Sequence, residues 1–375
     1  MYIHIYIYNH KMHMCLSACW SNILHIYIYK HICIYVYAYI YIRIYMYKSI
    51  FIYLYIFIYL CMYACMLVCI HATHGWYFNI VVGLHAFPVK SCRGIALQEM
   101  ELDAFGAKLD RRFMVVDEQG RFITQRQEAT MCRIEAVLLP NGDMTLSLPF
   151  ISQCCFTPAS VVSAENPEVL AGVWDDVVSA IDQGSQVEEW LTAVLERPSR
   201  LVGMTKEFDR PTSRKYTPAA VTGQTAFSDG FPLLLISEES LCELNSRLSG
   251  SPLPMNRFRP NVVVRGCSAY AEDMWRTLLV GGSKFHVVKP CSRCKMTTTD
   301  QDSGFRGEEP LTTLSTYRRK EHVKAPCGDK VDVFFGQNIC HEGPGSVAVG
   351  DRVLALWWQY PWLLGSFSHF YWAAQ

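Results

Sequence analysis

The chain has 375 residues with 34 basic and 34 acidic side chains, and its sequence pI is about 7.1. This balance argues against a broad nucleic-acid-binding surface, which needs a basic excess, while the length is sufficient for two domains. The 16 cysteines follow no framework spacing, which excludes a small disulfide scaffold and favours a reducing, intracellular compartment.

The first 75 residues differ in composition from the rest. Tyr and Ile alternate at residues 2–8, 27–29 and 39–42, as expected when a TA dinucleotide repeat is translated, because TAT and ATA encode Tyr and Ile. Residues 49–70 carry no charge and are long enough to cross about 30 Å of hydrocarbon as a helix. We therefore expect residues 1–75 to be a low-complexity repeat that is either a gene-model artefact or contains a membrane anchor at residues 49–70.

The pattern after residue 80 predicts short strands followed by a helix. Strands are expected between residues 81 and 136, where residues 113–117 and 121–124 flank Gly120 and predict a hairpin. Residues 138–148 predict a second hairpin, with its turn near Gly142. Residues 185–195 carry apolar side chains at helical spacing, and this helix is expected to end before Pro198.

The second half of the chain also predicts more strands than helices. Ser237 is the expected N-cap of a helix, with Glu238 and Glu239 in its first turn. Strands rich in Val, Leu and Phe are expected at residues 261–265, 284–289 and 347–356. This mixture predicts a β-rich α+β fold. No long Pro- or Ser-rich linker separates the two halves, so we expect them to pack closely.

A Cys-x-x-Cys motif, Cys291-Ser292-Arg293-Cys294, follows one of the predicted strands. Structural zinc needs four ligands, usually two such pairs, and Cys267, Cys327 and Cys340 are single and poorly spaced. A thioredoxin-like redox pair belongs at the start of a helix, which the following β-branched threonines do not favour. Two interpretations remain: one thiolate binds a soft transition metal whose other ligands come from a cofactor, or both cysteines are buried structural residues.

Several further motifs accompany this pair in order along the chain. They are Phe87-Pro88-Val89-Lys90-Ser91, Asp110-Arg111-Arg112-Phe113, Thr124-Gln125-Arg126-Gln127, Phe258-Arg259-Pro260-Asn261, Thr297-Thr298, Glu309-Pro310-Leu311 and Phe335-Gly336-Gln337-Asn338. Together they resemble the MOSC domain family, and in particular the molybdenum-dependent amidoxime-reducing proteins. The resemblance implies an N-terminal MOSC β-barrel domain at residues 81–200 packed on a MOSC β-barrel domain at residues 201–356. Residues 357–375 form an aromatic tail without assignment.

The resemblance also implies a molybdenum-pterin cofactor and the residues that bind it. Cys294 matches the thiolate that ligates the metal and is the implied catalytic residue, while Cys291 is expected to be structural or supporting. A thiolate suits molybdenum because it is a soft donor, and arginine suits phosphate because its planar fork binds in a bidentate manner. The implied cofactor-binding residues are Lys90, Ser91, Arg112, Asp229, Arg259, Asn261, Ser292 and Arg293. For Arg126, a cofactor contact and a surface ion pair remain open alternatives.

The implied activity is the reduction of N-hydroxylated small molecules such as amidoximes and hydroxylamines. No ferredoxin-type cysteine spacing follows Leu356, so the expected electron donor is a separate protein, either a b-type cytochrome with its NADH-dependent reductase or a ferredoxin-like protein. Association with mitochondria, with the membrane anchor, is implied by resemblance; the alternative location is the cytoplasm. An alternative function is a cofactor-binding or sulfur-carrier module, as in molybdenum cofactor sulfurases, where a MOSC domain follows a pyridoxal-phosphate-dependent desulfurase. A further alternative is an inactive paralogue.

Overall fold

The computed structural model describes residues 30–36, 79–221, 223–325 and 328–357. The chain divides into two compact units, residues 1–77 and 78–375, and the described residues of the first unit, 30–36, are helical. Within the described ranges, every helix is too short or too polar to cross a membrane. The predicted anchor at residues 49–70 and the aromatic tail beyond residue 357 lie outside these ranges.

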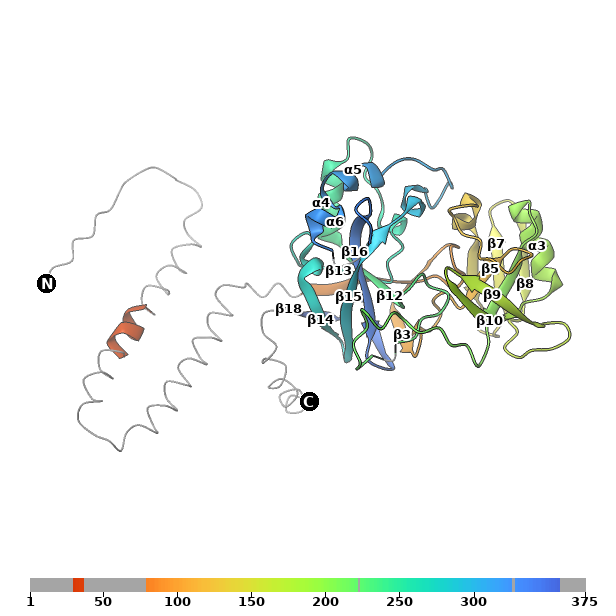
Figure 1. The fold of residues 1–375 in the computed structure, drawn as a ribbon, viewed down its shortest axis with the longest axis horizontal. Helices are drawn as coiled ribbons and strands as arrows, with labels where there is room; N and C mark the ends of the chain where they lie inside the picture. Colours follow the sequence, from red (N-terminus) through yellow and green to blue (C-terminus); the bar gives the residue numbers. More distant parts are fainter. Residues whose placement is uncertain (1–29, 37–78, 222, 326–327, 358–375) are drawn as a thin grey trace, which may run out of the picture. The chain divides into compact units, whose positions relative to one another are not determined.

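The second unit contains a closed barrel that, among the described residues, has seven strands (Figure 1). In neighbour order these are β13 (Val262–Arg265), β12 (Leu233–Ser237), β16 (Val333–His341), β15 (Ser283–Arg293), β14 (Trp275–Val280), β18 (Arg352–Trp357) and β1 (Asn79–Ala86). The barrel closes because β1 pairs with β13 as well as with β18, and β2 (Ile95–Leu97) extends the sheet from β1. The first described strand of the unit therefore completes a barrel whose other six strands come from the C-terminal half.

Alternation of apolar side chains along these strands fills the barrel interior. Leu84, Leu235, Val264, Trp275 and Phe285 are all fully buried in one cluster. Each such side chain contributes about 1.5–3 kcal/mol relative to exposure to water. On the outside, helices α4 (Glu238–Arg247), α5 (Leu311–Tyr317) and α6 (Lys320–Val323) lie against the strands.

The N-terminal half forms separate sheets beside the barrel (Figure 1). One sheet has the order β5 (Phe113–Val116), β11 (Arg200–Met204), β10 (Asp176–Asp182) and β9 (Glu168–Val173), and another contains β6 (Glu135–Leu138), β7 (Met144–Leu148) and β8 (Ile151–Phe156). Helix α3 (Ser185–Leu195) packs on β8 and β11. A third sheet joins β3 (Glu99–Asp103) and β4 (Gly106–Ala107) to β17 (Gly345–Ala348) of the C-terminal half. Short 3-10 turns are η1 (Ala129–Arg133), η2 (Met255–Arg257), η3 (Ala271–Met274) and η4 (Lys295–Thr298).

The predicted β-rich α+β fold is confirmed, as are several of its local elements. Helix α3 has the predicted bounds, and β6 and β7 form the hairpin predicted at residues 138–148, with Gly142 at a φ of 92°. Ser237 is the N-cap of α4, because its Oγ accepts the backbone N–H of Ser240 at 3.1 Å. Each of these elements is determined by residues that are close together in the sequence, so the local sequence pattern was sufficient to predict it.

Two strand predictions are wrong in detail. Residues 121–124 do not form a continuous strand, but the predicted hairpin around Gly120 forms: Phe122 bridges Val116, and the N–H of Ile123 donates to the carbonyl oxygen of Val115 at 2.8 Å. The strand β5 also pairs with the distant β11, which was not predicted. Residues 347–356 belong to two strands, the end of β17 and most of β18, because Gly350 turns the chain between them at a φ of 95°. The strand predicted at residues 284–289 continues to Arg293 and so includes Cys291.

Gly336 in the middle of β16 provides a test of this packing. Its φ is 78°, and an added Cβ would lie 2.6 Å from Cγ1 of Ile236 and 2.9 Å from the carbonyl oxygen of Leu235. Gly142 also has a positive φ, but nothing lies within 4 Å of its added Cβ, so it is the matched control. We expect Gly142→Ala to cost about 1–2 kcal/mol of unfolding free energy and Gly336→Ala roughly 2 kcal/mol more, as measured by denaturant unfolding. Equal losses would contradict the described contact with Ile236.

Candidate functional site

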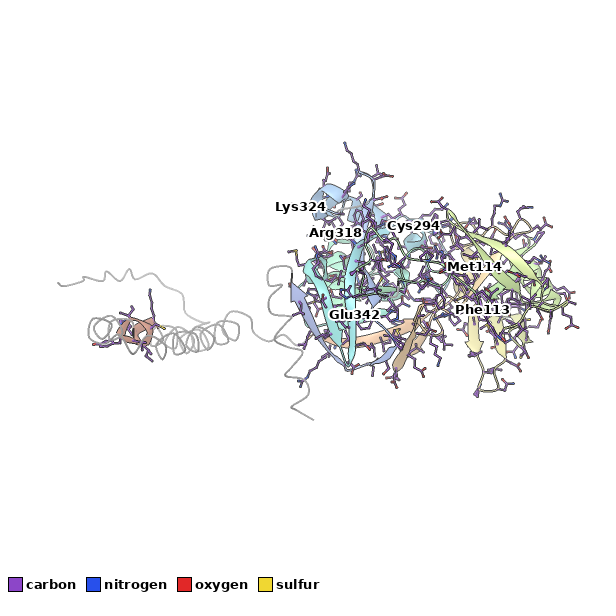
Figure 2. The ribbon with its side chains drawn as sticks, turned by 60° about the horizontal axis from the view of Figure 1, so that its bottom comes forward. Phe113, Met114, Cys294, Arg318, Lys324 and Glu342 are labelled. Atoms are coloured by element: carbon purple, nitrogen blue, oxygen red, sulfur yellow. The ribbon has the colours of Figure 1, made fainter. Side chains whose placement is uncertain are left out.

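Cys294 lies between β15 and η4, in extended conformation, at the N-cap position of η4. Its side chain is half-buried, and in Figure 2 it lies between Arg318 of the C-terminal half and Met114 of the N-terminal half. The loop that follows is held by Asp300, whose carboxylate accepts the backbone N–H of Ser303 at 2.8 Å and pairs with Arg257 at 3.0 Å. The thiol is therefore carried by a barrel strand and a braced loop.

Arg126 of the N-terminal half contacts this thiol. Its Nη1 lies 3.6 Å from Sγ of Cys294, and its guanidinium lies 4.4 Å from the ring centre of Trp174. Sequence reasoning left Arg126 undecided between a cofactor contact and a surface ion pair, and the structure brings it to the site. Its place in the Thr124-Gln125-Arg126-Gln127 motif was the only available signal, because no spacing rule relates it to Cys294.

Lys90 is buried and bridges the two halves. Its Nζ lies 2.6 Å from Oδ1 of Asp229 and donates to the carbonyl oxygen of Phe227 at 2.7 Å. Burial lowers the pKa of Lys90 to about 8, with further lowering by the Arg210 and Arg111 charges, although Asp229 opposes these effects. Loss of water around the Lys90 ammonium, rather than neighbouring positive charge, is therefore the main cause of its lowered pKa.

Asp229 joins Lys90 to the neighbourhood of Cys294. Its Oδ1 also accepts the indole N–H of Trp174 at 3.1 Å. The surrounding protein by itself would raise the pKa of Asp229, but the Lys90 ammonium, its hydrogen bond and the Arg126 charge outweigh this and hold the pKa well below its usual range. Since 59% of the Asp229 side chain is exposed, the carboxylate is ionised and accessible at the rim of the site.

Ser91 and Arg259 form a second, buried part of the site. Gln125 links them, because it donates to the carbonyl oxygen of Ser91 at 2.7 Å and to Gln301 at 3.1 Å, and Gln301 accepts from Arg259 at 3.3 Å. Both Ser91 and Arg259 have positive φ values, 68° and 55°. Such strained backbone is typical of ligand-binding sites. Burial, followed by the nearby Arg111 charge, lowers the pKa of Arg259.

The other predicted site residues make internal contacts. Arg112 donates to Asp103 at 2.7 Å and to the carbonyl oxygen of Ala107, and the Asn261 amide is bonded to the backbone of Leu234 and His85. Arg293 donates to Sγ of Cys291 at 3.0 Å and to the carbonyl oxygen of Phe258, while Ser292 is exposed. Their assignment as cofactor-binding residues stays a prediction, and the structure shows Asn261 tying β1 to β12.

The donor set of the site fits an anionic ligand. Among the described residues, the buried side-chain atoms without a hydrogen-bond partner include Ser91 Oγ, Arg112 Nε, Arg126 Nη2, Arg259 Nη2 and Arg293 Nε. All five can donate hydrogen bonds, and a buried donor left without a partner costs free energy. A phosphate-bearing cofactor would supply acceptors for such donors, and the Cys294 thiolate is a ligand that a soft metal prefers.

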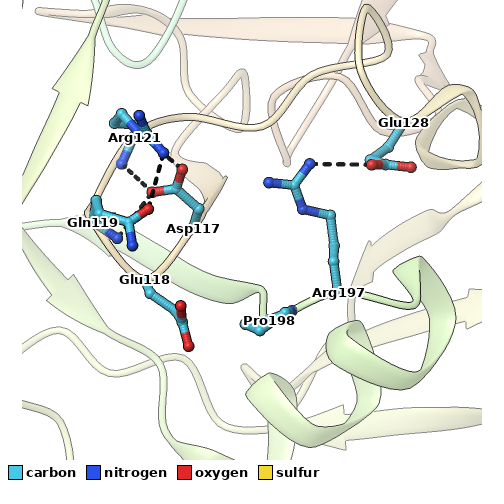
Figure 3. A pocket seen from close by; sticks show the side chains of 7 residues that line it. All are labelled: Asp117, Glu118, Gln119, Arg121, Glu128, Arg197 and Pro198. Carbon is cyan, nitrogen blue, oxygen red and sulfur yellow. Dashed lines mark hydrogen bonds and ion pairs between the residues drawn. The ribbon is translucent and has the colours of Figure 1, made fainter.

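A shallow cavity of about 380 Å³ lies elsewhere on the N-terminal half and has a different character. It is lined by Asp117, Glu118, Gln119, Arg121, Glu128, Arg197 and Pro198. Figure 3 shows its charges paired with one another, Arg121 with Asp117 and Arg197 with Glu128. None of these residues contacts Cys294 or Lys90 in the described structure, so the cavity does not belong to the candidate site.

Comparisons with known proteins place the chain in a family. The family described as "MOSC N-terminal beta barrel domain" matches residues 78–198, and the "MOSC domain" matches residues 222–354. The chain belongs to this family of MOSC proteins with an N-terminal MOSC β-barrel domain.

Individual relatives show which members of this family the chain is similar to. The chain is 36% identical over 298 residues to mitochondrial amidoxime-reducing component 1 of Homo sapiens, covering 74% of this chain and 82% of the relative. The Mus musculus component 1 is 35% identical over 286 residues, with the same coverage. The chain is also 29% identical over 301 residues to the molybdenum cofactor sulfurase of Bos taurus, of which it covers 32%.

The lowered pKa of Lys90 predicts how anion binding depends on pH. A bound anion favours the ammonium form, so binding raises the pKa of Lys90 and takes up a proton once the pH exceeds about 8. The affinity of the metal-free protein for pyrophosphate is therefore expected to fall roughly tenfold between pH 7 and pH 9, as measured by isothermal titration calorimetry. Lys90→Met should bind more weakly at pH 7 and lose most of this dependence. The same slope in Lys90→Met would show that another group is responsible.

Proposed function

We propose that this chain is a molybdenum-cofactor-dependent reductase of N-hydroxylated small molecules, including amidoximes and hydroxylamines. The observation that carries the proposal is the position of the Cys294 thiol, 3.6 Å from the Arg126 guanidinium, beside buried cations whose donors lack partners. This combination is what a cofactor with a soft metal at one end and a phosphate at the other requires. The amidoxime-reducing relatives support the choice of reaction.

Each residue has a distinct part in the proposed site. Cys294 would ligate the metal. Arg126 would donate a hydrogen bond to the Cys294 sulfur and so tune the reduction potential of the metal. Lys90, Ser91 and Arg259 would hold the phosphate, with Lys90 paired to Asp229 at 2.6 Å. When bound, the cofactor supplies the two-electron redox chemistry. The remaining predicted cofactor contacts, from Arg112, Asp229, Asn261, Ser292 and Arg293, are part of the proposal.

The overall reaction needs electrons from outside the chain. An amidoxime, two electrons and two protons give an amidine and water, so the N–O bond is broken and the oxygen leaves as water. We propose that a separate protein supplies the electrons, either a b-type cytochrome with its NADH-dependent reductase or a ferredoxin-like protein. The names of the relatives support a mitochondrial association, with membrane anchoring through residues 49–70 as part of this proposal.

A second candidate is a cofactor-binding or sulfur-carrier module without reductase activity. The similarity to the molybdenum cofactor sulfurase favours it, since the chain matches about a third of that protein. This candidate keeps the same cofactor-binding residues and a reactive Cys294. The two candidates differ in whether loaded protein turns over an amidoxime.

The two cysteines of the motif form a matched pair for testing the metal ligand. The full chain, made in a host that synthesises the pterin cofactor, is expected to contain about one molybdenum per chain by mass spectrometry. Cys294→Ala should lose the metal or most of the amidoxime reduction measured with a chemical electron donor, because the soft ligand is removed. Cys291→Ala should keep both, because the Cys291 sulfur accepts a hydrogen bond from Arg293 and packs against a hydrophobic cluster, contacts that indicate a structural role.

The outcomes separate the candidates. Molybdenum without amidoxime turnover in the wild-type chain would support the binding module and contradict the reductase. A folded wild-type chain without molybdenum would overturn both candidates. Equal losses in the two cysteine variants would contradict the assignment of Cys294 as the single ligand.

A further inference from the structure

Trp174 occupies a backbone position that does not favour tryptophan. It begins the two-residue turn between β9 and β10, and its φ is 59°, whereas its neighbour Asp175 has no positive φ. Hairpin turns with a positive φ at the first central residue strongly favour glycine. A bulky residue held there costs conformational free energy, and such strain is typical of functional positions.

The indole of Trp174 contacts two opposite charges at once. Its ring centre lies 4.4 Å from the guanidinium of Arg126, and its Nε1 donates to Oδ1 of Asp229 at 3.1 Å. Half of the side chain is nevertheless exposed, 50%, so burial of apolar surface does not explain its position. Phe122 supports the ring from the side, with ring centres 5.2 Å apart.

The two charges are near each other, yet they do not pair. Arg126 contributes, after Lys90, to the low pKa of Asp229, which places the guanidinium within electrostatic range of the carboxylate. Among the ion pairs of the described residues, Asp229 pairs with Lys90 and none joins it to Arg126. Instead Arg126 donates to Sγ of Cys294 at 3.6 Å. The carboxylate of Asp229 would be a stronger hydrogen-bond partner for the guanidinium than the sulfur of Cys294.

We propose that Trp174 is a positioning residue: its indole separates Arg126 from Asp229 and thereby directs the Arg126 guanidinium to the Cys294 sulfur. The ring face binds the cation and the N–H edge binds the carboxylate, so one rigid side chain satisfies both charges and prevents their pairing. Lys90 is then the cation left to pair with Asp229. The consequence for turnover rests on the proposed function, whereas the consequence for the position of Arg126 does not.

Trp174→Gly tests this without disturbing the turn, because glycine is the residue that the turn favours. In a crystal structure of the full-length, metal-free variant, we expect Arg126 to pair with Asp229 and to leave Cys294. In Trp174→Gly/Asp229→Asn the competing charge is removed, and Arg126 should return to the thiol. Arg126 remaining within hydrogen-bonding distance of Cys294 in Trp174→Gly would overturn the proposal, as would its failure to return in the double variant.

The loaded protein offers a second readout. Loss of a hydrogen bond to a metal-bound sulfur lowers the reduction potential of the centre, so a redox titration of Trp174→Gly should show a lower value than wild type. The kcat for amidoxime reduction should fall on the order of tenfold with KM little changed, since no substrate contact is removed. Trp174→Phe, which keeps the ring face but loses the N–H, should show a smaller change in both.

A matched control comes from helix α3. Trp190 also donates its indole N–H to an acceptor, the carbonyl oxygen of Ser152 at 2.6 Å, but it packs against the buried cluster that contains Leu191 and Phe156. Trp190→Phe is expected to leave the potential and kcat unchanged. An unchanged potential in Trp174→Gly, or a raised KM with unchanged kcat, would assign Trp174 to another role. A wild-type chain without molybdenum would refute the proposed function but not the proposed role of Trp174, because the crystallographic test of that role needs no metal.

Discussion

The pairing of β1 with β13 and β18 is the constraint on which the site depends. It closes the barrel and places the residues just after β1 beside those just before β13. The Arg259 guanidinium thereby lies 4.2 Å from the ring centre of Phe87, and the Asn261 amide fixes the junction through the backbone of His85 at 3.1 Å. When a site is built from two halves of a chain, its geometry is only as precise as the strand pairing that joins those halves.

The site concentrates positive charge where the protein excludes water. Lys90 and Arg259 are buried, and the pKa of each is lowered by its surroundings. Lys90 pairs directly with the largely exposed carboxylate of Asp229, whereas no ion pair among the described residues includes Arg259. Such an arrangement costs stability in the free protein, and an anionic ligand recovers this cost by satisfying the unpaired donors. Binding and folding stability are therefore linked at this junction.

How much could be predicted depended on the distance in sequence between partners. The bounds of α3 and the Ser237 cap of α4 were predictable, because helix periodicity and capping involve residues within a few positions. The pairing of β5 with β11 was not predictable, because β11 lies more than eighty residues further along the chain and no local pattern links the two strands. In the same way, Lys90, Arg259 and Cys294 were predicted from family motifs, while Arg126 stayed undecided and Trp174 was not considered.

The sequence by itself determined the class of fold, the chemistry available at Cys294 and the set of cationic residues that accompany it. Residue type and local spacing carry that information, because they decide which side chains can ligate a metal or bind a phosphate. Only the tertiary structure decided which of these side chains meet. Arg126 reaches Cys294, and Trp174 contacts both Arg126 and Asp229, although these segments are far apart in the chain. The physical reason is that packing and strand pairing, rather than local propensity, set the distances between such segments.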